Sequence, residues 1–97
     1  MKHWNIKIYG RVQGVGFRLS AKSVAEKLNI TGFARNESDG SVYLEAEGPV
    51  LSEVEGEKEN LEKFLEWCHR GPLFARVDKV VVEEENQLKN FTEFNVL

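Results

Sequence analysis

The sequence predicts an α+β fold in which two helices lie on one face of an antiparallel sheet. Several segments alternate between apolar and polar residues with the period of a half-buried strand. Two other segments have the i, i+3, i+4, i+7 apolar spacing of an amphipathic helix. These segments follow one another in the order β-α-β-β-α-β, with one further strand at the end of the chain. Such an order packs as a sheet with its helices on one side.

The first half of the chain supplies a strand, a glycine turn, a helix and a hairpin. Trp4, Ile6 and Ile8 alternate with polar residues, whereas the apolar stripe after the turn has helical spacing. Ser38-Asp39-Gly40 is a turn signal of the kind that closes hairpins. The expected ranges are residues 4–12 (strand), 13–18 (turn), 19–29 (helix), 30–36 (strand) and 41–47 (strand). In the last of these, Val42, Leu44 and Ala46 are expected to face the core, and Tyr43, Glu45 and Glu47 the opposite side.

The second half of the chain begins with a local irregularity. The sequence Glu-Ala-Glu-Gly ending at Gly48 is echoed by Glu-Val-Glu-Gly ending at Gly56, so residues 49–56 are expected to be a peripheral insertion. On the next helix, Cys68 belongs to the apolar stripe and is expected to be a small core residue. The expected ranges are residues 58–70 (helix), 77–84 (strand) and 91–96 (final strand). The complete order is that of the ferredoxin-like sandwich, which hosts many unrelated functions.

Length and composition indicate one globular domain over residues 1–97. Hydrophobic residues make up 41% of the chain, which argues against disorder. The net charge of −3 gives no general attraction for nucleic acid or an anionic membrane, so an anion site must be built locally. Cys68 is the only cysteine, which excludes an intrachain disulfide, and no apolar run approaches membrane-spanning length. We therefore expect a cytoplasmic protein that binds neither nucleic acid nor membrane.

The turn between the first strand and the first helix is the main candidate for a site. Gly14 and Gly16 let consecutive backbone N–H groups turn toward one point, and the helix N-terminus adds a partial positive charge. A phosphate-sized anion suits such a cup, and Arg18 can hold it with two parallel hydrogen bonds. Two glycines in a strand-to-helix connection are also ordinary loop chemistry. The turn is neither a dinucleotide fingerprint nor a Walker loop.

Asn36 is the second candidate residue. In the predicted topology the first and second strands flank the third and run parallel, so both end at the same end of the sheet. Asn36 closes the second strand, and its amide offers a donor and an acceptor to an anion bound at that end. Asparagine also favours the start of a turn, and its position alone leaves the two interpretations open.

Three segments closely resemble the acylphosphatase family: Gly-Arg-Val-Gln-Gly-Val-Gly-Phe-Arg at 10–18, Gly-Phe-Ala-Arg-Asn at 32–36 and Asp-Gly-Ser-Val at 39–42. The resemblance extends to Gly-Pro at 71–72, to Ala-Arg-Val at 75–77 and to the phenylalanines Phe91 and Phe94, so it covers nearly the whole chain. The turn and its spacing to Asn36 are highly specific, whereas the C-terminal features are weaker. The chain departs from the family pattern at Phe33 and Ala34, where the family often has Trp and Val, and in the insertion.

The resemblance implies an enzyme that hydrolyses the carboxyl–phosphate bond of small acyl phosphates, releasing a carboxylate and inorganic phosphate. In the family, the amides and the arginine of the turn bind the phosphate, and the asparagine holds the attacking water. If the matching positions of this chain have the same roles, the resemblance makes Arg18 and Asn36 the catalytic residues. It implies phosphate contacts from the turn residues Gln13, Gly14, Val15, Gly16, Phe17 and Arg18. It implies no metal and no cofactor, and we expect a monomer.

Three alternative interpretations use the same fold differently. The cup can bind an anion without turnover. RNA-binding sheets share the element order, but they need exposed aromatic residues on a basic face, and the third strand offers Tyr43 among acidic residues. Similar domains also form the N-terminal module of carbamoyl-phosphate-processing proteins, although the chain length favours a free-standing enzyme. His3 and His69 have no recognisable metal-ligand spacing, and we expect neither to be catalytic.

Overall fold

The computed structural model describes residues 1–48 and 59–97, which form five strands and two helices. The strands are β1 (Lys2–Arg11), β2 (Thr31–Asn36), β3 (Val42–Gly48), β4 (Arg76–Glu85) and β5 (Phe94–Val96), and the helices are α1 (Phe17–Lys27) and α2 (Asn60–Arg70). Every element lies where the sequence predicts it, with ends that differ by at most three residues. The predicted insertion at 49–56 falls outside the described residues.

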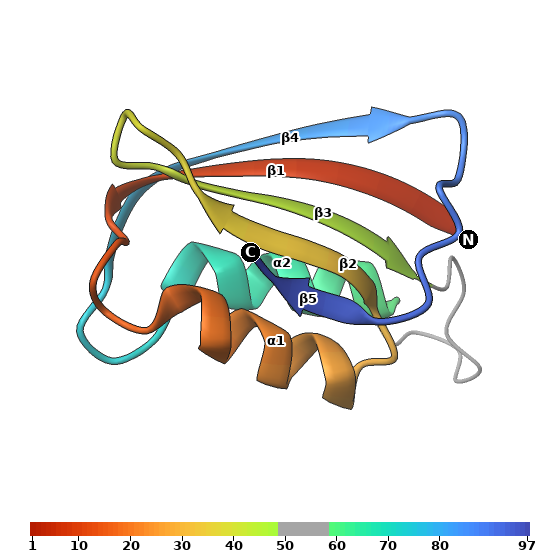
Figure 1. Cartoon of the computed structure of the whole chain (residues 1–97), viewed down its shortest axis with the longest axis horizontal. Helices are drawn as coiled ribbons and strands as arrows, with labels where there is room; N and C mark the ends of the chain where they lie inside the picture. Colours follow the sequence, from red (N-terminus) through yellow and green to blue (C-terminus); the bar gives the residue numbers. More distant parts are fainter. Residues whose placement is uncertain (49–58) are drawn as a thin grey trace.

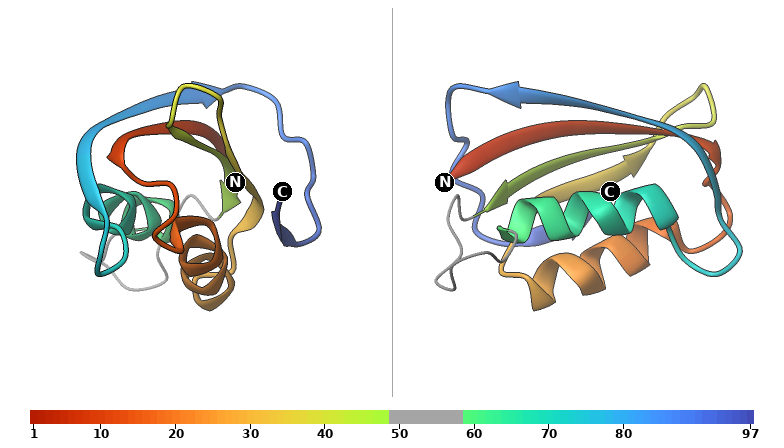
Figure 2. Two further views of the ribbon diagram at one scale, coloured as in Figure 1. Left: turned by 60° about the vertical axis from the view of Figure 1, so that its left-hand side comes forward. Right: turned by 180° about the vertical axis from the view of Figure 1, so that it is seen from behind.

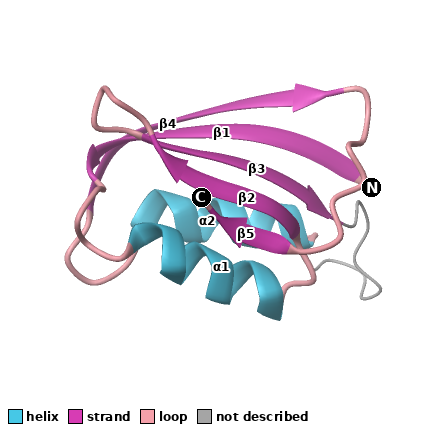
Figure 3. Ribbon diagram, in the orientation of Figure 1, coloured by secondary structure: helices cyan, strands magenta, loops and turns pink. Residues whose placement is uncertain are grey.

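The strands form one sheet in the order β4-β1-β3-β2-β5 (Figures 1 and 3). β1 pairs antiparallel with β3 and β4, and β2 pairs antiparallel with β3. The prediction of an antiparallel sheet is wrong at one edge, because β5 pairs parallel with β2. β4 ends at the same end of the sheet at which β2 begins. The chain crosses there through residues 86–93 and therefore enters β5 in the direction of β2.

Both helices lie on one face of the sheet, with the core between them and the strands (Figure 2). The predicted stripes face inward, since Ala21 and Ala25 of α1 and Leu61, Phe64 and Cys68 of α2 are buried. The sheet contributes Trp4, Ile6, Ile8, Ala34, Val42, Leu44 and Ala46. Burying one large apolar side chain stabilises the fold by about 1.5–3 kcal/mol. Within residues 1–48 and 59–97, no helix is long and apolar enough to cross a membrane.

The opposite face of the sheet is partly covered, which the strand periodicity did not predict. Glu45 and Glu47 alternate with core residues, as expected, but they are only 6% and 2% exposed. Residues 86–93 run over them. The ammonium group of Lys89 lies 2.7 Å from Oε1 of Glu45, and the N–H of Phe91 donates to Oε1 of Glu47 over 3.2 Å. The crossing from β4 to β5, rather than the local pattern, buries these carboxylates.

His3 lies at the centre of this covered region and is fully buried. Its Nδ1 is 2.7 Å from Oε2 of Glu47, and its Nε2 is 2.9 Å from Oδ1 of Asn5 and 3.0 Å from Oε1 of Glu45. Both ring nitrogens face acceptors, an arrangement that an imidazolium ring satisfies because both of its nitrogens donate. The ring also stacks on Phe91, with ring centroids 5.9 Å apart. His3 therefore joins the start of β1 to the crossing segment.

The two glutamates of this network are stabilised as carboxylates. Burial by itself raises the pKa of Glu45, but hydrogen bonds from Lys89 and Tyr43 outweigh burial, and the pKa lies below its ordinary value. Burial acts in the same way on Glu47. There the hydrogen bonds from the backbone N–H of Lys89 and from His3 outweigh burial and lower the pKa.

These shifts predict an acid-sensitive contribution to stability. Because the pKa of Glu47 is lowered in the folded state, the stabilisation is present above the unfolded pKa of 4.5 and is lost as the pH falls through the folded pKa. We expect Glu47→Gln to lower the free energy of unfolding near neutral pH by about 1–3 kcal/mol and to flatten its fall in acid. Urea unfolding at a series of pH values measures both effects. The exposed Glu26→Gln is the control, and an unaltered pH dependence in Glu47→Gln would contradict the assignment.

Candidate active site

Three connections meet at one end of the sheet: residues 12–16 between β1 and α1, 37–41 between β2 and β3, and 71–75 between α2 and β4. β1 and β2 are each antiparallel to β3, so both end here, and α1 begins here. β4 is antiparallel to β1 and also begins here. Figure 1 and the right-hand view of Figure 2 show the three connections at the same end of the molecule. The structure thus brings Asn36 to the end of the sheet that carries the glycine turn, as the topology predicts.

The glycine turn is shorter than predicted, because α1 begins at Phe17 and includes Arg18. Gly14 and Gly16 have φ angles of 74° and 76°, which residues with a Cβ rarely adopt. Gly16 is the N-cap, and the N–H of Ser20 donates to its carbonyl over 3.0 Å. The N–H groups of the first helical turn have no acceptor within the helix, and the N-cap offers no side chain. These donors and the positive end of the helix are suited to an anion.

A cavity of about 100 Å³ lies at this helix N-terminus. The residues that line it are Val12, Gly14, Gly16, Phe17, Arg18, Leu19 and Asn36. Both predicted catalytic residues and four of the six predicted phosphate-binding residues are therefore in its wall. Gln13 and Val15 are not, because Val15 packs against the core and the side chain of Gln13 turns toward the hairpin.

Arg18 and Asn36 reach the cavity from different elements. Arg18 is the second residue of α1, and its Nη1 donates to the carbonyl oxygen of Leu97 over 2.5 Å. A guanidinium group has five N–H donors, so others are left for a ligand. Asn36 is the last residue of β2 and is exposed, and its side chain makes no hydrogen bond within residues 1–48 and 59–97. Both polar side chains can therefore turn toward a molecule in the cavity.

Gln13 has a role that the sequence does not reveal. Its Nε2 donates to the backbone carbonyl oxygens of Glu37, over 2.7 Å, and Ser41, over 2.9 Å. These two residues begin and end the connection between β2 and β3. One side chain thus fixes the glycine turn relative to the strand end that carries Asn36. The sequence could not predict this contact, because it depends on where the connection between β2 and β3 lies relative to the glycine turn.

The hairpin is itself held by Asp39. Its carboxylate accepts hydrogen bonds from the N–H of Ser41 over 3.0 Å and from the hydroxyl of Ser41, and it pairs with the ammonium group of Lys7 over 3.1 Å. The hydrogen bonds from Ser41, followed by that from Lys7, lower the pKa of Asp39 to about 2. The carboxyl group of Asp39 therefore stays ionised, and able to accept these hydrogen bonds, above strongly acidic pH.

All five arginines of the chain lie at this end of the molecule. They are Arg11 at the end of β1, Arg18 at the start of α1, Arg35 near the end of β2, Arg70 at the end of α2 and Arg76 at the start of β4. Two are paired with neighbouring acids, Arg35 with Glu37 at 3.4 Å and Arg76 with Asp78 at 3.1 Å. Although the chain has a net charge of −3, the end that carries the cavity is locally cationic. This distribution favours the approach of an anion.

The other residues considered from the sequence lie outside the cavity wall. His3 is at the opposite end of β1, within the buried network. His69 is exposed in the last turn of α2, where a basic side chain suits the helix C-terminus. Cys68 is buried on α2, and burial raises the pKa of its thiol. It is a core residue, as predicted, rather than a reactive thiolate.

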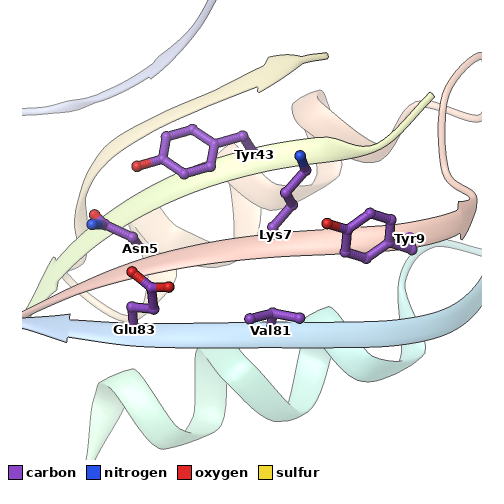
Figure 4. Close-up of a pocket in the computed structure, with 6 residues that line it drawn as sticks. All are labelled: Asn5, Lys7, Tyr9, Tyr43, Val81 and Glu83. Carbon is purple, nitrogen blue, oxygen red and sulfur yellow. The ribbon is translucent and has the colours of Figure 1, made fainter. Parts of the chain in front are cut away.

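An open groove of about 250 Å³ lies on the sheet face opposite the helices (Figure 4). It is lined by Asn5, Lys7, Tyr9, Tyr43, Val81 and Glu83. Tyr9 and Tyr43 are aromatic residues of the kind that an RNA-binding sheet needs, but Lys7 is paired with Asp39 and Glu83 adds a negative charge. The groove lacks the basic character that a nucleic-acid backbone requires. The absence of nucleic-acid binding stays a prediction.

A family model, Acylphosphatase, matches residues 4–96, which include the glycine turn, the hairpin and β5. The chain belongs to the acylphosphatase family. An acylphosphatase from Salinibacter ruber is 45% identical over 95 residues, covering 98% of this chain and 92% of that protein. The crystal structure of acylphosphatase from Bacillus subtilis has a TM-score of 0.87 at 34% identity, covering 100% of this chain and 99% of that one. These matches confirm the predicted family and the ferredoxin-like fold.

The same fold occurs within a larger protein. A crystal structure of full-length HypF, in the phosphate- and nucleotide-bound form, has a TM-score of 0.81 at 30% identity. The match covers 99% of this chain but 12% of that one. The acylphosphatases from Salinibacter ruber and Bacillus subtilis, in contrast, match over nearly their whole length.

The position of Gln13 predicts that it supports phosphate binding indirectly. Gln13→Ala removes both hydrogen bonds between the turn and the hairpin, each of which contributes about 1 kcal/mol. We expect the affinity for inorganic phosphate to fall by a factor of roughly 5–30, which corresponds to a loss of about one or two kcal/mol. Isothermal titration with phosphate measures this change. Gln87→Ala, at an exposed position in the crossing segment, is the matched control. An unchanged affinity in Gln13→Ala would mean that other contacts hold the turn.

Proposed function

We propose that this protein hydrolyses acyl phosphates to a carboxylate and inorganic phosphate, with the cavity at the N-terminus of α1 as its active site. In this proposal the first-turn N–H groups of α1 and the guanidinium group of Arg18 hold the phosphoryl group. Asn36 orients the attacking water. The observation that carries the proposal is that one cavity is lined by Arg18, Asn36 and both turn glycines, in a chain of the acylphosphatase family.

The reaction needs little from the protein beyond position and positive charge. A carboxylate is a good leaving group, so no strong general acid is required. In phosphoryl transfer the charge is spread over three equatorial oxygens, and preorganised donors stabilise it. The helix N-terminus supplies several such donors at fixed positions, and Arg18 adds a full positive charge. Because these groups are already oriented, little reorganisation accompanies the reaction.

Asn36 cannot act as a base, since an amide does not take up a proton near neutral pH. Its carbonyl oxygen can accept a hydrogen bond from water, and this fixes the direction of attack on phosphorus. The proton released by water then passes to an oxygen of the phosphoryl group. The exposed, unbonded side chain at the end of β2 supports this role, because it is free to hold a water molecule.

The monomeric state and the cytoplasmic location stay predictions. Acyl phosphate is the substrate and inorganic phosphate is the product that would occupy the same cavity.

The test is release of inorganic phosphate from benzoyl phosphate in the presence of a metal chelator. We expect Arg18→Ala to lower the rate by about 10³–10⁵, as loss of a transition-state arginine does elsewhere. Arg18→Lys should recover only part of this loss, because an ammonium group lacks the planar fork of donors. Asn36→Ala should lower kcat more than it changes the affinity for phosphate. Arg76→Ala, an exposed arginine at the same end that does not line the cavity, is the control.

Two outcomes would overturn the proposal. Near-normal turnover in Arg18→Ala would remove the assignment of the arginine. No turnover by folded wild-type protein, together with tight phosphate binding, would instead favour an anion-binding module without catalysis.

A further inference from the structure

The connection between β2 and β3 directly follows Asn36, so its shape affects where that side chain lies. Asn36 is the last residue of β2 and pairs with Val42 of β3. Its side chain makes no hydrogen bond within residues 1–48 and 59–97, so no neighbouring polar group fixes its direction. The direction of the amide consequently depends on the backbone at the end of the strand.

A short series of hydrogen bonds shapes this connection. The N–H of Glu37 donates to the carbonyl of Ser41 over 2.9 Å, which closes the connection immediately after Asn36. The N–H of Ser41 donates in turn to Oδ1 of Asp39 over 3.0 Å, and the hydroxyl of Ser41 donates to the same oxygen. The carboxylate of Asp39 is therefore linked, through Ser41, to the peptide group that follows Asn36.

Lys7 anchors this carboxylate to the middle of the sheet. Its ammonium group lies 3.1 Å from Oδ2 of Asp39, the oxygen that Ser41 does not use. Lys7 belongs to β1, which is paired on both sides, with β3 and with β4. Figure 4 shows its side chain between those of Tyr43 and Tyr9. The cation thus comes from a strand that cannot easily move.

The ion pair and Gln13 hold different parts of the connection. Gln13 donates to the carbonyls of its first and last residues, whereas Lys7 holds Asp39, which lies in the middle. Gln13 also belongs to the glycine turn of the proposed phosphate site, but Lys7 does not line the cavity. Loss of the ion pair should therefore affect Asn36 and leave the phosphate site in place.

We propose that Lys7 is a positioning residue for the reaction: by fixing Asp39 it sets the shape of residues 37–41 and hence the direction in which Asn36 presents its amide to water. This proposal rests on the proposed function. The side chains of the ion pair are 35% and 47% exposed, so the pair adds little to the stability of the fold. Its contribution is to geometry, because a small displacement of an orienting group slows a reaction even when its cause lies far from the reacting atoms.

The test measures kcat and KM for benzoyl phosphate, and the dissociation constant of inorganic phosphate, in Lys7→Met, Asp39→Asn and the double variant. Methionine keeps an unbranched apolar stem without the ammonium group. Asparagine can still accept from the N–H two residues on, but it lacks the negative charge. We expect each single variant to lower kcat by about three- to tenfold, less than the roughly 10²-fold cost of a 1 Å misplacement. KM and the phosphate dissociation constant should stay unchanged, because an interaction made only in the transition state is lost.

Two comparisons show whether the variants act through the ion pair. The double variant should be no slower than either single variant, because residues that act through one contact are not additive. Lys7→Arg should keep most of the rate, since a guanidinium group can also pair with a carboxylate. Lys79→Met is the matched control. The ammonium groups of Lys7 and Lys79 lie 5.4 Å and 5.8 Å from the centre of the Tyr9 ring, but Lys79 makes no ion pair within residues 1–48 and 59–97.

The outcomes separate this inference from the proposed function. A fall in kcat that Lys7→Arg prevents and Lys79→Met does not reproduce supports the inference. An unchanged kcat in Lys7→Met overturns it and leaves the function standing. Additive losses in the double variant, or a phosphate dissociation constant that rises as kcat falls, also overturn it, because the residues then act separately or through the phosphate site. No turnover by folded wild type overturns the function and the inference together.

Discussion

The arrangement of the site depends on one constraint of chain direction. β1 and β2 are separated by β3 in the sheet, and both run antiparallel to it. The chain must therefore return along the whole sheet between them, and α1 makes this return. The end of β1, the start of α1 and the end of β2 consequently lie together. An exposed helix N-terminus, an arginine in its first turn and an asparagine at a strand end then meet at one small cavity.

The polar groups at the two ends of the sheet differ in their burial and in what they bind. At one end, buried ionic groups centred on His3 hold the crossing segment against the sheet, with carboxylates that stay ionised despite burial. At the other end, backbone donors and arginines are left open to solvent. β5 links the two ends, because it continues from the crossing segment to Leu97, whose carbonyl accepts a hydrogen bond from Arg18. By holding the crossing segment, the network around His3 thus also helps to position β5 and Leu97 for the contact with Arg18.

The charge and shape of the end that carries the cavity explain how a protein with a net negative charge can bind an anionic substrate. The net charge of −3 is an average over a surface whose arginines are gathered at one end. Glycines at the turn let the backbone present its N–H groups, and Gln13 keeps the turn in place without contacting the cavity. The proposed chemistry therefore uses mostly backbone groups, whose positions depend on the fold rather than on side-chain flexibility.

The sequence by itself determined the order of the elements, their approximate ranges, the stripes of α1 and α2 and the family, because apolar periodicity and the glycine turn are local signals. It also placed Arg18 and Asn36 at one end, since this follows from strand order. The tertiary structure decided that Glu45 and Glu47 are buried, that β5 runs parallel to β2 and that Gln13 bridges two connections. Each of these depends on where a distant segment returns to the sheet. Such contacts between residues far apart in the chain leave no trace in local periodicity.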